Sequence, residues 1–272
     1  MPLLLTISLY LWTLRGCAQV VTALWLLWLG AAPAQAALPV LVIATSELPP
    51  YVSATPQNSF LTDLLQEIGK EMDVRFEFRF MPWPRCELAV ETHQAWATMP
   101  YVPTAERKQK FLFSQPLYAK RTMLFYYHSQ AGKPDTRQLP TRFQQLSELS
   151  PYRLGGVRGY YYEKLFAEAG LSLELASSEE LSFRKLHAGR VDLVPAVETV
   201  GWDIIRSNFA QEQSAFSVLD TPLDVGHNYL MTSRYYPNAE HLLEQFNQAL
   251  QTLRRTGMYS QIAMRHGVPE ND

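Results

Sequence analysis

The chain has 272 residues, and its 24 basic and 26 acidic side chains give a formal net charge of −2. This balance excludes the clustered basic face by which proteins hold nucleic acid. The chain contains two cysteines, Cys17 and Cys86, and its cysteines and histidines do not stand at the spacing of a zinc site. We therefore expect no nucleic-acid partner, no metal and no cofactor.

The first 36 residues have the layout of a cleaved secretory signal. Arg15 is their only charged residue, residues 20–29 form a short apolar core, and Ala34-Gln35-Ala36 supplies the cleavage site. A retained membrane anchor is the alternative; a lipoprotein signal is not, because Cys17 precedes the apolar core. Cleavage would place a protein of 236 residues in the periplasm, with 23 basic and 26 acidic side chains. Cys86 would then be its single cysteine, so an intramolecular disulfide is excluded.

Residues 39–80 predict a first β-α-β unit. Residues 39–45 form a continuous apolar run, which is typical of a strand buried on both faces. Apolar residues recur at helical spacing between Phe60 and Met72, and residues 74–80 alternate apolar with charged side chains, as a strand does. The order strand, helix, strand predicts a parallel α/β sheet.

A second unit of the same kind is predicted over residues 152–209. Its expected strands cover residues 152–157, 171–175 and 191–197, and its expected helices cover residues 160–169, 178–189 and 198–209. Gly170 follows the first of these helices, in the position that a glycine commonly takes after a helix end.

Two further strands flank the second unit. They are predicted at residues 122–127 and 225–232, a polar linker lies at 129–149, and a C-terminal helix covers residues 242–253. Two α/β lobes joined by two strands would leave a cleft between them, and clefts between domains are the usual place for small ligands.

Arg107 stands out in the segment between the two units. A strand-like apolar run ends at Met99-Pro100, and Thr104-Ala105-Glu106-Arg107 reads as a polar turn. A guanidinium offers a rigid fork that matches a carboxylate. From the residues alone, Arg107 is either the anchor of an anionic ligand or an arginine paired with Glu106 or another surface acid.

Several short motifs follow one another along the chain. They are Glu47-Leu48-Pro49-Pro50-Tyr51, Asp63-Leu64-Leu65, Thr104-Ala105-Glu106-Arg107, Phe113-Ser114-Gln115-Pro116, Gly156-Val157-Arg158-Gly159, Ala188-Gly189-Arg190-Val191-Asp192 and Gly257-Met258-Tyr259. Each motif is weak by itself, but their order resembles the family 3 extracellular solute-binding proteins, the polar amino-acid type that serves ABC importers. Met81-Pro82-Trp83-Pro84-Arg85 also resembles a Pro-Trp-x-Arg subgroup of that family.

The resemblance implies an α/β fold of two lobes, the type II periplasmic binding protein fold, with two crossover strands as the hinge. It implies residues 1–36 as signal peptide, residues 37–126 and 227–272 as lobe 1, and residues 127–226 as lobe 2. It also implies a periplasmic monomer that binds a small molecule, is not an enzyme, and passes its ligand to the membrane subunits of an ABC transporter. Arg107 becomes the carboxylate anchor.

The chain departs from the family pattern around the expected pocket. Pro100-Tyr101-Val102-Pro103 and Gly159-Tyr160-Tyr161-Tyr162 stand where typical members carry small hydroxyls for the carboxylate. Typical members also offer an aspartate to the ligand's ammonium, and here the nearest acid is Glu198, displaced by one position. These differences put a standard α-amino acid in doubt.

Aromatic side chains take the place of those hydroxyls, and they can hold flat rings or cations. Arg158 could meet a second anionic group, and Glu47 could accept an ammonium. The alternative for each of these residues is an ordinary place in the core or on the surface. The predicted ligand-binding residues are Arg107, Tyr101, Tyr160, Tyr161, Arg158, Glu198, Glu47, Tyr51 and Trp83.

Two other functions stay open on the same fold. The first is a periplasmic enzyme similar to cyclic-acid dehydratases, for which Glu198 or Glu47 would be the general acid or base. The second is a ligand-sensing partner of a membrane receptor. Fold alone does not decide among them.

Overall fold

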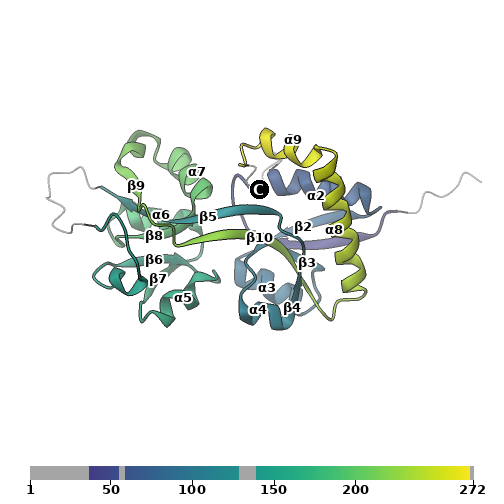
Figure 1. Cartoon of the computed structure of the whole chain (residues 1–272), viewed down its shortest axis with the longest axis horizontal. Helices are drawn as coiled ribbons and strands as arrows, with labels where there is room; N and C mark the ends of the chain where they lie inside the picture. The colour runs from purple at the N-terminus through teal and green to yellow at the C-terminus, as the bar shows by residue number, and fades with distance from the viewer. Residues whose placement is uncertain (1–36, 55–58, 129–138, 270–272) are drawn as a thin grey trace, which may run out of the picture. The chain divides into compact units, whose positions relative to one another are not determined.

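The computed structural model describes residues 37–54, 59–128 and 139–269 (Figure 1). From residue 39 onward the described residues form one unit, which the following paragraphs describe. The expected signal peptide, residues 1–36, lies outside the described residues. Within the described ranges, the helices are all too short or too polar to cross a membrane.

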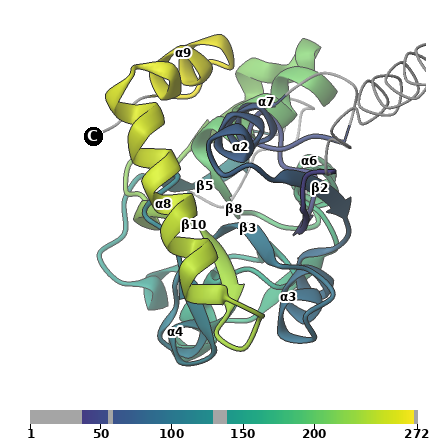
Figure 2. The same cartoon turned by 90° about the vertical axis from the view of Figure 1, so that its right-hand side faces the viewer.

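Lobe 1 is built on parallel strands, as the first β-α-β unit predicts. Strand β1 lies between β2 and β3 and is parallel to both, with Ile43 opposite Phe78 on one side and Ala97 on the other. The elements of lobe 1 are β1 (Val40–Thr45), α2 (Phe60–Glu71), β2 (Arg75–Phe80), α3 (Trp83–Glu91), β3 (Ala97–Tyr101), α4 (Ala105–Lys110), β4 (Phe111–Phe113), α8 (Ala239–Arg255) and α9 (Met258–Arg265). Helix α8 packs against α2 and α9 (Figure 2).

Helix α2 shows how the sequence determines these elements. It begins after Ser59, whose backbone N–H donates to Thr62 Oγ1 at 2.9 Å. Its apolar residues Phe60, Leu64 and Ile68 recur at helical spacing and are completely buried. The amphipathic pattern therefore places one face of α2 on the sheet.

Lobe 2 contains the second α/β unit. Strands β6 and β7 pair in parallel, and a parallel bridge between Leu154 and Leu193 joins β6 to the segment that leads into β8. The elements of lobe 2 are the 3-10 helix η1 (Leu146–Leu149), β6 (Leu154–Val157), α5 (Tyr162–Glu168), β7 (Leu173–Ala176), α6 (Glu179–His187), β8 (Val194–Val197), α7 (Glu198–Asn208), the 3-10 helix η2 (Ala210–Ala215) and β9 (Phe216–Val218).

Two long antiparallel strands, β5 (Tyr118–Tyr127) and β10 (Asp224–Ser233), join the lobes side by side (Figure 1). The strand order of the large sheet is β2-β1-β3-β10-β5-β8, so β10 pairs with lobe 1 and β5 pairs with lobe 2. Lys120 lies opposite Gly226 in the middle of the paired segment. We call β5 and β10 the crossover strands, and they agree with the predicted hinge strands.

Several boundaries differ from the sequence prediction. Strand β5 begins four residues before the expected start at Thr122, and α5 begins at Tyr162 rather than at residue 160. The expected turn at residues 104–107 was wrong: Thr104 caps α4, and its Oγ1 accepts the Arg107 N–H at 3.2 Å. Helix α3 was not predicted; Pro82 is its N-cap, and Pro84 lies in its first turn, where proline is favoured.

Candidate ligand-binding site

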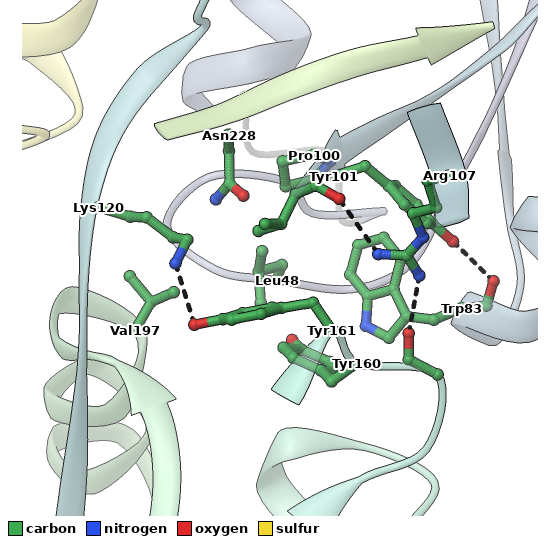
Figure 3. Close-up of a pocket in the computed structure, with 12 residues that line it drawn as sticks. Leu48, Trp83, Pro100, Tyr101, Arg107, Lys120, Tyr160, Tyr161, Val197 and Asn228 are labelled. Atoms are coloured by element: carbon green, nitrogen blue, oxygen red, sulfur yellow. Dashed lines mark hydrogen bonds between the residues drawn. The ribbon is translucent and has the colours of Figure 1, made fainter. Parts of the chain in front are cut away.

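A small inner cavity lies between the two lobes, beside the crossover strands (Figure 3). Its volume is about 40 Å³, enough for roughly three water molecules. The C-terminal ends of β3 and β8, together with the loops after β3 and β6, supply seven of its twelve lining residues. The lining residues are Leu48, Trp83, Pro100, Tyr101, Val102, Arg107, Lys120, Gly159, Tyr160, Tyr161, Val197 and Asn228.

Arg107 reaches this cavity from α4, and its side chain is 11% exposed. Its Nε and Nη2 donate to Glu87 Oε2 at 3.1 and 2.9 Å, and its Nη1 donates to the Val102 carbonyl at 3.4 Å. The guanidinium carbon lies 4.6 Å from the centre of the Tyr101 ring, in cation–π contact. The acid that pairs with Arg107 is therefore Glu87 on α3, and not Glu106.

Arg107 also links the two lobes. Its Nη2 donates to the Gly159 carbonyl of lobe 2 at 3.1 Å (Figure 3). Gly159 has a φ of +87°, and a Cβ there would lie 3.0 Å from the Pro84 ring. Glycine is needed at this position both for the left-handed backbone and for the close approach of lobe 1. Of the five N–H donors of the guanidinium, the contacts to Glu87, Val102 and Gly159 use four.

An aromatic wall covers one side of the cavity. Tyr101 OH donates to the Trp83 carbonyl at 2.8 Å, and the rings of Trp83 and Tyr160 meet edge to face with centroids 6.1 Å apart. Burial raises the pKa of Tyr101 well above its usual value, so its hydroxyl stays protonated and acts as a donor. The structure thus brings together five of the nine residues that the sequence proposed, namely Arg107, Tyr101, Tyr160, Tyr161 and Trp83.

Lys120 on β5 is a cavity residue that sequence reasoning missed. Its side chain is 1% exposed and forms an ion pair with Asp224 of β10. Its ammonium also donates to Tyr161 OH at 3.0 Å and to Thr122 Oγ1 at 3.3 Å, and it lies 4.4 Å from the centre of the Tyr161 ring. Burial lowers the pKa of Lys120, and the nearby Asp224 opposes that effect. These contacts of Lys120 hold the Tyr161 side chain against the crossover strands.

Glu179 is a second missed residue, at the start of α6. It is 7% exposed and accepts a hydrogen bond from Tyr160 OH. Desolvation by burial raises the pKa of its carboxyl to about 7, although its backbone contacts and the nearby Trp83 indole lower it. The indole Nε1 is buried and makes no hydrogen bond of normal geometry with the described residues. Trp83 comes from lobe 1 and Glu179 from lobe 2, so their approach is part of the contact between lobes.

A wider cleft opens outward from the inner cavity. Its volume is about 490 Å³, and it shares Arg107, Gly159, Tyr160 and Tyr161 with the inner cavity. Its rim carries more acidic than basic side chains, with Glu87, Glu91, Glu106 and Glu163 against Arg107 and Lys164. Arg107 therefore stands where the acidic rim meets the inner cavity, whose described lining residues include no acid.

Two predicted residues line a different cavity, of about 560 Å³, on the far side of the crossover strands. Tyr51 OH is 2.8 Å from Thr199 Oγ1, a contact between the lobes. Glu198 forms an ion pair with Arg121 at 2.6 Å. Tyr51 stacks on Tyr118 with ring centroids 4.1 Å apart. The structure does not bring Tyr51 and Glu198 to the inner cavity, because these contacts hold them elsewhere.

Glu47 and Arg158 also lie outside the inner cavity. The Glu47 carboxylate accepts the backbone N–H of Ala54 at 2.8 Å and so closes the loop after β1. Arg158 is exposed and lines none of the three cavities.

The described residues include no group of three or more His, Cys, Asp and Glu side chains able to hold a metal ion. Cys86 is buried in α3, where its thiol donates to the Met81 carbonyl at 3.3 Å. Burial raises the pKa of this thiol to about 12, so it is not a nucleophile at neutral pH.

Comparison with solved structures shows the same fold in binding proteins. A histidine kinase sensor domain with similarity to periplasmic binding proteins matches with a TM-score of 0.73 at 19% identity, over 84% of this chain and 96% of that chain. The substrate binding protein of an amino acid ABC transporter matches with a TM-score of 0.66 at 20% identity, over 83% and 98%. The substrate-binding protein AbpA from Streptococcus pneumoniae, solved with L-arginine, matches with a TM-score of 0.68 at 20% identity, over 84% and 94%. The curated proteins include no match.

A family model covers nearly all of the described chain. It is the model of the bacterial extracellular solute-binding proteins, family 3, and it matches residues 41–268. The two α/β lobes, the crossover strands and the cavity between the lobes agree with that match. The chain belongs to the bacterial extracellular solute-binding proteins of family 3.

Proposed function

We propose that this protein captures a small carboxylate-bearing molecule between its two lobes and delivers it to an ABC importer. Family membership supports a binding role, and the solved relatives include substrate-binding proteins of amino acid ABC transporters. Delivery to an importer and a place in the periplasm rest on this likeness and on the predicted signal peptide.

The observation that carries the proposal is the position of Arg107. A largely buried guanidinium lines a cavity that residues of both lobes enclose. In such a water-poor place, a charge-assisted bond to a carboxylate contributes about 1.5–3 kcal/mol.

Lobe closure follows from the contacts of the same residue. Arg107 reaches the Gly159 carbonyl only while the lobes are together. A ligand carboxylate that replaces this carbonyl would keep Arg107 paired and would bridge the lobes. The ligand would then bind the closed arrangement more tightly than an open one, which is the condition for ligand-driven closure.

The experiment is a thermal-shift screen of the purified protein against amino acids, polyamines, small di-acids and aromatic acids, followed by calorimetry on the hits. A ligand at 100 times its dissociation constant adds about 2.7 kcal/mol to the free energy of unfolding, which corresponds to roughly 5–10 °C in Tm for a protein of this size. Arg107→Ala should weaken binding of the best carboxylate ligand by roughly 10- to 100-fold.

The matched control is Arg79→Ala. Arg79 is exposed on β2, where it pairs with Glu77. The Arg79→Ala variant should leave the affinity for the carboxylate unchanged. Each variant is compared with its own ligand-free Tm, because loss of the Arg107–Glu87 pair also affects stability. If Arg107→Ala and Arg79→Ala bind the carboxylate equally well, the anchor role of Arg107 is refuted.

Ligand sensing is the second candidate function, because one solved relative is a histidine kinase sensor domain. Pull-down of the ligand-loaded protein with membrane extracts distinguishes the two candidates by the partner retained, a transporter or a receptor. Product analysis of the binding mixtures tests for turnover. Glu47 and Glu198, the acids that dehydratase-like chemistry would use, are engaged outside the inner cavity.

A further inference from the structure

We propose that the ligand is a carboxylic acid without an α-ammonium group, and not an amino acid. This inference rests on the proposed function, since it assigns the chemical class of the molecule that Arg107 anchors. It follows from the charges that face the inner cavity.

Two cationic side chains, Arg107 and Lys120, line the inner cavity from opposite ends (Figure 3). Their counter-ions, Glu87 and Asp224, are not among the lining residues. None of the described residues that line the cavity is an Asp or a Glu. The cavity therefore presents the positive side of two ion pairs to whatever it holds.

Among the described residues, no acid lines the cavity to pair with an ammonium group, and the buried Glu179 already accepts the hydrogen bond of Tyr160 OH. Glu198 is paired with Arg121 on the far side of the crossover strands, and Glu47 accepts the N–H of Ala54. Glu87 is paired with Arg107 and lines the wider cleft, not the inner cavity. An ammonium next to Arg107 and Lys120 would be both repelled and stripped of its hydration.

The hydrogen-bonding groups of the cavity favour the same ligand class. The contacts of Arg107 leave one donor on Nη1. Two cations and the free N–H of Arg107 suit carboxylate oxygens, and the rings of Tyr101, Tyr160 and Tyr161 suit an apolar or flat remainder.

The test uses pairs of acids that differ only in the amino group: propionate and alanine, glutarate and glutamate, 3-phenylpropionate and phenylalanine. Calorimetry at pH 7.5 on the purified protein gives the dissociation constant of each. The amine-free acid of a binding pair should bind roughly 10- to 100-fold more tightly, because the ammonium loses its solvation without a partner.

An amino acid that binds as tightly as its amine-free partner, or more tightly, overturns this inference and leaves the proposed function intact. If no member of any pair binds and the wider thermal-shift screen yields no carboxylate either, the carboxylate function itself is refuted, and the inference falls with it. These two outcomes are therefore distinguishable.

Two variants sharpen the result. Asn228 lines the cavity from β10, where its Nδ2 donates to Tyr118 OH at 2.8 Å. Asn228→Asp adds a carboxylate at nearly constant shape, and it should move the affinity ratio toward the amino acid by tenfold or more, on the order of one charge-assisted hydrogen bond. Glu198→Gln should leave the ratio unchanged. A selective loss of amino-acid binding in Glu198→Gln would also overturn the inference, because the ammonium would then contact Glu198.

Discussion

Replacement of Glu179 by glutamine should stabilise the protein at high pH and change its stability little at low pH. The neutral amide keeps the size of the side chain and an oxygen that can accept the hydrogen bond from Tyr160. It removes the negative charge that burial disfavours at this position.

The magnitude follows from the pKa of the Glu179 carboxyl. Burial raises this pKa from 4.5 to about 7, and each unit corresponds to 1.36 kcal/mol. Since the folded protein holds this proton more tightly than the unfolded chain, the contribution of protonated Glu179 to stability is complete below pH 4.5. It declines as the pH rises and is lost once the pH has passed about 7. The wild type should thus lose about 2–3 kcal/mol of its free energy of unfolding between pH 5 and pH 8 through this carboxyl, a loss that Glu179→Gln avoids.

The assay is urea unfolding at pH 5 and pH 8, followed by tryptophan fluorescence. The quantity of interest is the difference between variant and wild type, because the other titrating groups then cancel. Glu180→Gln is the matched control, since Glu180 is the next residue, lies half exposed and pairs with Arg184. If Glu179→Gln and Glu180→Gln change the free energy of unfolding equally at both pH values, the buried-charge reasoning is refuted.

Two further changes test the packing. Gly201→Ala on α7 should lower the free energy of unfolding by roughly 1–3 kcal/mol, because a Cβ there would lie 2.3 Å from the buried Phe125 ring. This clash should outweigh the helix preference of alanine. Urea unfolding measures the change. Gly226 has open space around it, so the free energy of unfolding of Gly226→Ala should stay within about 0.5 kcal/mol of the wild-type value. Equal stability of the two variants would contradict the predicted clash at Gly201. The Cys86 thiol should resist a thiol reagent at pH 7.5 in the native protein and react in urea, because burial keeps it protonated. Mass spectrometry of the Cys86 peptide reads the labelling, and native labelling as fast as in urea would contradict its burial.

The period of the apolar residues was sufficient to predict most of the fold. Alternation in residues 74–80 predicted β2, and helical spacing from Phe60 predicted α2. Helix α4 has six mainly charged residues and no apolar face, so it carries no hydrophobic period. Its capping threonine, Thr104, was the available signal.

The candidate site was predictable in part. The loops after β3 and β6 were found because motif order and aromatic residues marked them. Lys120 was missed because the strand was expected to begin at Thr122, although Tyr118, Lys120 and Thr122 alternate onto one buried face. Glu179 was missed because an acid in the first turn of a helix is ordinarily solvated. Its burial depends on Trp83 and Tyr160, which no local pattern relates to it.

The strand order also has a consequence for how the chain folds as it is made. Strand β10 lies between β3 and β5 in the sheet, yet it follows every strand of lobe 2 in the sequence. The partners of β6, β7, β8 and β9 are therefore all synthesised before the sheet of lobe 1 is complete. Until residues 229–233 arrive, β3 has an unpaired edge, which is a template for wrong pairing with other chains. Lobe 1 is thus the first lobe to be synthesised but the last to complete its sheet. Its unpaired β3 edge is the site that a chaperone would most need to protect.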